Sequence, residues 1–235
     1  MKALEERLHD FIMHSNIGAE DADNLDDLFK KEDGTQHSRP DYFLRGRSVI
    51  LEKKTITKDP TNEFNSWLNK LTEDDPWLAA NWLTPMPVEQ IIQAHPDHLS
   101  FRSKLCNRLY RGLRNDIMRK ASKQLLETQR LLGLDRAVKG LLLLNEKVEA
   151  YEEQILINEI EKNLSRTKIN NEPECKGIDF VLLISETKTD TKHNRYPCNL
   201  IISEHAYNKP IIPFHMRDLI IKWSVFNRRP LIEIN

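Results

Sequence analysis

The chain has 235 residues, 39% hydrophobic and 30% charged, and its 35 Lys and Arg almost balance its 36 Asp and Glu. The net charge of −1 argues against a purely basic nucleic-acid coat, and a chain of this length buries a sizeable core without a disulfide or metal staple. Three separated cysteines, a charged N-terminus and apolar runs much shorter than a membrane span predict a folded cytoplasmic protein without a membrane partner.

The first half of the chain predicts one helix, a hairpin and a helical insertion. Leu4, Leu8, Phe11 and Ile12 recur at helical spacing, which predicts a helix over about 2–14. An acidic helical turn is expected near Leu25, Leu28 and Phe29. The β-rich runs 42–44 and 48–51 flank the turn 45–47 and predict a hairpin. Several prolines divide residues 59–112 into short helices, which we expect to cover part of a sheet.

The second half alternates helices and strands. Its apolar patterns predict helices at 115–132 and 148–164, a C-terminal helix through 217–226, strands at 138–144, 178–184 and 199–202, and extended pieces at 210–213 and 231–234. Strand, helix and strand in succession are typical of a sheet that is buried on both faces. The predicted fold class is therefore α/β.

Charge is distributed unevenly along the chain. Residues 1–38 carry four basic and ten acidic side chains, a net charge of −6, whereas residues 102–139 carry eleven basic and three acidic ones, a net charge of +8. A basic helical block can follow a phosphate backbone, although by itself such a block is more often a solvated helix face.

The residues with the strongest chemical signal lie in the predicted hairpin. Asp41 follows Pro40, and eleven residues later Glu52 and Lys54 point to one face of the second strand. Two carboxylates can hold Mg²⁺, and a lysine can orient or deprotonate a water molecule, which is the inventory for metal-assisted phosphodiester hydrolysis.

Pro-Asp followed by Glu-x-Lys resembles the motif of the PD-(D/E)XK nuclease superfamily, and the order helix, hairpin, long helix, strand resembles its restriction-endonuclease-like core. The resemblance covers about 2–55 and 115–145 of a single domain, 1–235, with 59–112 inserted. It implies Mg²⁺, replaceable by Mn²⁺, held by Asp41, Glu52 and the Lys53 carbonyl, with Lys54 as the catalytic lysine.

The same resemblance extends the site to the two predicted helices. Many members add an acidic residue from the first helix, and Glu5 fits because it borders the apolar stripe there. On the long helix, Lys120 and Gln124 are four residues apart and share a face that could meet the scissile phosphate. The adjacent Arg119 and Lys123 complete the expected nucleic-acid-binding set.

We therefore expect a Mg²⁺-dependent endonuclease acting on DNA or RNA, in line with the defence or mobile-element roles of prokaryotic members. A homodimer, or a protein partner bound through 59–112, stays open. The alternatives are an inactive nuclease-fold binding module and a helix-rich regulatory protein. Lys53 departs from the usual pattern, since it falls on the opposite face of a buried strand and needs a partner or a route to solvent. Asp179 and Glu186 are interpreted as solvated strand ends.

Overall fold

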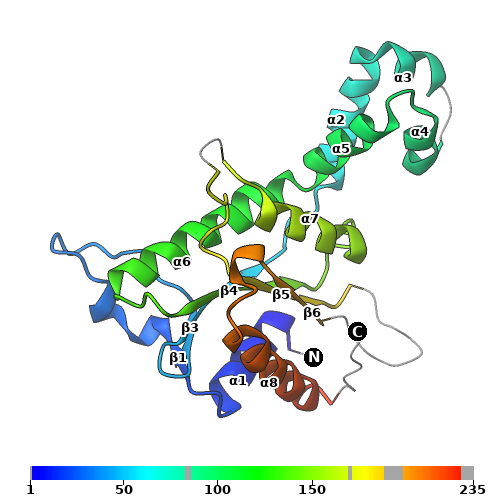
Figure 1. Ribbon diagram of the computed structural model, residues 1–235. Helices are drawn as coiled ribbons and strands as arrows, with labels where there is room; N and C mark the ends of the chain where they lie inside the picture. Colours follow the sequence, from blue (N-terminus) through cyan, green and yellow to red (C-terminus); the bar gives the residue numbers. More distant parts are fainter. Residues whose placement is uncertain (1, 83–85, 169–170, 188–197, 229–235) are drawn as a thin grey trace.

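A six-stranded mixed sheet forms the centre of the molecule in the computed structural model, which describes residues 2–82, 86–168, 171–187 and 198–228 (Figure 1). The strands are β1 (Ala19–Asp21), β2 (Tyr42–Leu44), β3 (Val49–Thr55), β4 (Val138–Asn145), β5 (Phe180–Ser185) and β6 (Cys198–Ile202). They lie side by side in chain order, and β3, β4 and β5 run parallel while the other pairs are antiparallel. The predicted α/β class and the 42–51 hairpin are confirmed.

Helices cover both faces of this sheet. The helices are α1 (Leu4–His14), α2 (Thr61–Asp74), α3 (Pro76–Asn81), α4 (Val88–Ala94), α5 (His98–Leu109), α6 (Arg119–Leu131), α7 (Glu153–Ser165) and α8 (Ile211–Phe226). One core lies between the sheet and α1 with α8, and a second lies between the opposite face and α6 with α7 (Figure 1). Strands β4 and β5 are buried on both faces, as their nearly continuous apolar sequences predict.

We call helices α2–α5 the arm. Contrary to the prediction, the arm does not cover the sheet. It projects from the body (Figure 1). The arm has its own apolar core, to which each of the four helices contributes, and Trp67, Trp77 and Trp82 pack against it. Because these helices bury their apolar faces against one another, they need no part of the sheet to cover them.

Three other boundaries differ from the predictions. Residues 210–213 are not extended, since α8 begins at Ile211 and accommodates Pro213 in its first turn, where a proline costs no helical hydrogen bond. Helix α7 begins at Glu153 rather than near Val148. A π-helical stretch, Leu113–Met118, precedes α6. The predicted extended piece 231–234 lies outside the described residues.

None of the described helices is long and apolar enough to span a bilayer.

Candidate active site

Strand β3 presents two different chemical faces. Ile50 and Ile56 belong to the core under α6, and Leu51 belongs to the core under α1. Because side chains alternate along a strand, Glu52 and Lys54 share the α6 face with the two isoleucines. This confirms that Glu52 and Lys54 lie on one face.

Asp41 is fixed against the backbone of β3 immediately before β2. Its N–H donates to the Leu51 carbonyl at 3.0 Å, and its Oδ2 accepts from the Lys53 N–H at 2.6 Å. These two bonds bracket Glu52, since one joins the residue before it and the other the residue after it. The Asp41 carboxyl is consequently close enough for its charge to raise the pKa of Glu52. The hairpin thus brings the two predicted carboxylates together.

Glu52 is a buried carboxyl group that the protein satisfies only in part. It is 1% exposed, and Oε1 forms an ion pair with Lys54 Nζ. Among the described residues, Oε2 has no hydrogen-bond partner. Burial, reinforced by the Asp41 charge, raises the pKa of Glu52 to about 7 against the opposing effect of Lys54, and burial also raises the pKa of Asp41. Ionised Glu52 therefore lacks a compensating positive charge or donor at Oε2.

The oxygen atoms around Glu52 are suitable ligands for a divalent cation. Asp41, Glu52 and the Lys53 carbonyl offer hard oxygen atoms, because the N–H and C=O of a strand residue point to the same edge and the Lys53 N–H already meets Asp41. In the described part of the chain, no three His, Cys, Asp or Glu side chains gather as a ready-made metal site. A cation here would therefore have two carboxylates, one carbonyl and water, a set that suits Mg²⁺ because it keeps several waters when bound.

Glu5 lies apart from this cluster. Its Oε1 pairs with Lys53 Nζ at 2.9 Å and its Oε2 accepts from the Thr55 hydroxyl at 2.9 Å, both on the α1 face of β3. The hydrogen bond from Lys53 is the main cause that lowers the pKa of Glu5. Glu5 is thus the partner that Lys53 needs, and the structure does not bring it to Glu52 and Lys54 as expected.

Of the four residues singled out on α6, Gln124 reaches the neighbourhood of Asp41. Its amide donates to the Arg39 carbonyl, two residues before Asp41. The three cations lie on the surface and pair with nearby acids: Lys120 with Asp116 at 3.2 Å, Lys123 with Glu127 at 3.7 Å and Arg119 with Glu174 at 2.8 Å. Gln124 therefore holds the segment that carries Asp41, whereas the cations remain a surface feature.

A second buried cluster of charged groups, one acid with three basic partners, was not predicted from the sequence. Asp179 is fully buried rather than solvated, and its carboxylate meets the Lys139 N–H at 2.8 Å, Lys139 Nζ at 3.3 Å, Lys209 Nζ at 2.8 Å and His205 Nε2 at 3.3 Å. Asp179 directly precedes β5, and Glu186 directly follows it. The two residues therefore lie at opposite ends of the parallel strands. Glu186 is not at a solvated strand end either, because it is largely buried and pairs with Arg7. Lys139 is also buried, so the basic block 102–139 is not one continuous surface.

The buried Glu52 makes stability depend on pH in a predictable direction. Its folded pKa of about 7 exceeds the value of 4.5 for an exposed glutamate, so the folded protein holds this proton more tightly than the unfolded chain. Its stabilising contribution is present below the unfolded pKa and is lost as pH rises through 7. We expect metal-free protein to lose up to about 3 kcal/mol from this group between about pH 4.5 and 8.

Urea unfolding in EDTA at about pH 5 and pH 8 measures this effect. Glu52→Gln should remove the loss, and Mg²⁺ should reduce it in the wild-type protein because a bound cation favours the ionised carboxylate. Equal pH dependence of the wild-type protein and Glu52→Gln would show that Glu52 titrates normally.

Comparisons with models of protein families, with curated proteins and with solved structures find no match to this chain.

Proposed function

We propose that the protein is a Mg²⁺-dependent nuclease of the PD-(D/E)XK type that hydrolyses phosphodiester bonds of nucleic acid, with DNA as the first substrate to test. The observation that supports this most is Glu52, a buried carboxylate that has Asp41 beside it, Lys54 on one oxygen and, among the residues that the structure describes, no donor on the other. A structural role alone would satisfy such a group or replace it with an apolar side chain.

In the proposed reaction the chain's own groups bind and orient the reactants. Asp41, Glu52 and the Lys53 carbonyl would hold the cation, and the cation would supply positive charge to polarise the scissile phosphate. Lys54 lies on the same face as Glu52 and can donate hydrogen bonds to the attacking water or to a phosphate oxygen. Gln124 fixes the Arg39 backbone, which keeps Asp41 in place against β3.

The test is cleavage by the wild-type protein of supercoiled plasmid and of labelled single-stranded and double-stranded oligonucleotides. We expect cleavage with Mg²⁺ or Mn²⁺ and none in EDTA. Asp41→Asn keeps the size of the side chain but weakens cation binding, so it should abolish cleavage while the protein remains folded. The matched control is Asp10→Asn, which changes an exposed carboxylate paired with Lys2 at 2.6 Å. Cleavage that persists in EDTA or in Asp41→Asn would contradict the proposal.

The arm favours a second candidate, a nuclease-fold protein that binds nucleic acid or a protein without cutting. Its separate core and projection from the body are suited to an interaction module (Figure 1). Nucleic-acid binding that is unchanged by Mg²⁺, together with no cleavage of any substrate, would support this candidate over the nuclease.

A further inference from the structure

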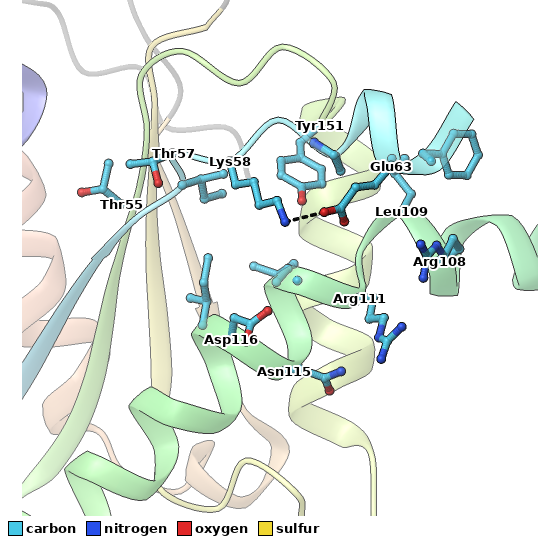
Figure 2. A pocket seen from close by; sticks show the side chains of 16 residues that line it. Thr55, Thr57, Lys58, Glu63, Arg108, Leu109, Arg111, Asn115, Asp116 and Tyr151 are labelled. Carbon is cyan, nitrogen blue, oxygen red and sulfur yellow. Dashed lines mark hydrogen bonds and ion pairs between the residues drawn. The ribbon is translucent and has the colours of Figure 1, made fainter. Parts of the chain in front are cut away.

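A cavity of about 600 Å³ opens where the arm joins the body (Figure 2). We call it the junction cavity. Its walls come from the end of β3 and the residues that follow it, the first turn of α2, the end of α5, the π-helical stretch and Tyr151. Its volume falls in the range of pockets that take small organic groups. Its lining comes from segments that are distant in the chain, so no local sequence pattern predicts it.

The junction cavity lies next to the candidate active site. Ile56, which lines it, follows Glu52 and Lys54 on the same face of β3. Thr55, the residue directly after Lys54, lines the cavity as well, so the cavity begins about one strand residue, ~3.4 Å, from the Lys54 backbone. A strand of nucleic acid whose phosphate sits at Lys54 would therefore pass its next nucleotide into this cavity.

The rim of the junction cavity is basic and its interior is partly apolar. Lys58, Arg108 and Arg111 lie at the rim with two carboxylates, Glu63 and Asp116 (Figure 2). Lys58 pairs with Glu63 at 2.6 Å and Asp116 pairs with Lys120 at 3.2 Å. Within the described ranges no acid forms an ion pair with the exposed Arg111, which leaves its guanidinium available for a phosphate.

The interior offers surfaces on which a base can lie. Tyr151 and Leu113 are buried in the wall, Ile56 is buried beside them, and Phe64 is partly buried. Asn115 also lines the cavity (Figure 2); its Oδ1 accepts from Arg119 at 3.0 Å, so its amide nitrogen is the group that can donate to a base edge. Cations that follow the backbone, together with aromatic and apolar surfaces for bases, are the features of single-strand binding sites.

We propose that the junction cavity binds an unpaired nucleotide next to the scissile phosphate, so that the protein selects single-stranded nucleic acid or an unpaired segment of a duplex. Arg111 holds the phosphate of that nucleotide, and the wall formed by Tyr151 and Ile56 receives its base. This inference rests on the proposed function for the position of the scissile phosphate. A fully paired base is unavailable to the cavity, because its faces are stacked and its pairing edge is occupied.

Direct binding tests the junction cavity separately from catalysis. Fluorescence anisotropy in EDTA, with labelled single strands of DNA and of RNA and a DNA duplex of equal length, should show tighter binding of the single strands. We expect Arg111→Ala to weaken single-strand binding about tenfold and to reduce the slope of log affinity against log salt by about 0.7, the value for one lost phosphate contact. Arg111→Lys should restore most of that slope, because it restores the charge.

The matched control is Lys222→Ala, which removes a cation of α8 outside the junction cavity. It should change single-strand affinity less than twofold. Equal affinity for the duplex and single strands, or an affinity and salt slope unchanged in Arg111→Ala, would overturn the proposal. Arg111-dependent binding without any metal-dependent cleavage would support the cavity and count against the nuclease, so the two proposals fail separately.

Discussion

Replacing Lys54 with methionine is expected to lower Mg²⁺-dependent cleavage by about 10²–10⁴-fold, whereas the same replacement of Lys53 should leave it within about threefold. The two lysines are adjacent in β3 but point to opposite faces. Lys54 pairs with Glu52 on the α6 face, and Lys53 pairs with Glu5 at 2.9 Å on the α1 face. The comparison therefore removes one ammonium group from each face of the same strand. Initial cleavage rates measured with saturating Mg²⁺ give the result.

Unfolding curves must accompany these rates, because Lys54→Met leaves the buried Glu52 without its cation. The loss of Lys54 destabilises the folded protein mainly when Glu52 is ionised. Unfolding curves recorded below pH 7, where Glu52 holds its proton in the folded protein, should therefore show a smaller decrease in stability. A folded Lys54→Met protein that cleaves at the wild-type rate would remove Lys54 from the reaction. Equal losses in both variants would show that the effect is structural rather than chemical.

Asp179→Ala is expected to lower the free energy of unfolding by about 3–5 kcal/mol. Asp179 is fully buried, and it is the carboxylate that meets Lys139, Lys209 and His205. Its loss leaves Lys139, which is 5% exposed, as a charge in the core without its partner. Burial already lowers the pKa of Lys139, so part of the cost appears as loss of its proton. Urea unfolding at neutral pH measures the change.

The double variant Asp179→Ala with Lys139→Met should recover much of the loss, because it removes the uncompensated charge and keeps an apolar side chain of similar length. Asp10→Ala, which breaks an exposed ion pair with Lys2, should lower the free energy of unfolding far less than Asp179→Ala does. A loss below about 1 kcal/mol in Asp179→Ala would show that the cluster contributes little to stability.

The parts of the site that follow from local periodicity could be predicted from the sequence. Alternation along a strand places Glu52 and Lys54 together and Lys53 opposite, and the short turn of the hairpin returns the chain so that Asp41 meets β3. Neither inference requires knowledge of distant segments. The structure agrees with both.

The features that depend on contacts between distant segments could not be predicted. Glu5 borders the apolar stripe of α1 as expected, but only the packing of α1 against β3 decides that it meets Lys53 rather than Glu52. The sequence predicts that Asp179 is a solvated strand end. In the structure it is buried and forms ion pairs with Lys139 and Lys209, which are distant in the chain. The arm projects because its four helices satisfy one another, which short helices separated by prolines do not reveal.

Helix α5 of the arm continues into α6 of the body with little interruption. Tyr110 interrupts the regular helix after α5, yet its N–H still donates to the Cys106 carbonyl at 2.9 Å, and Arg114 N–H donates to the Tyr110 carbonyl at 3.2 Å. The π-helical stretch then continues directly into α6 (Figure 1). Helix α6 carries Gln124, which donates to the Arg39 carbonyl near Asp41, so the arm is joined to the candidate active site by nearly continuous helix rather than by a loop.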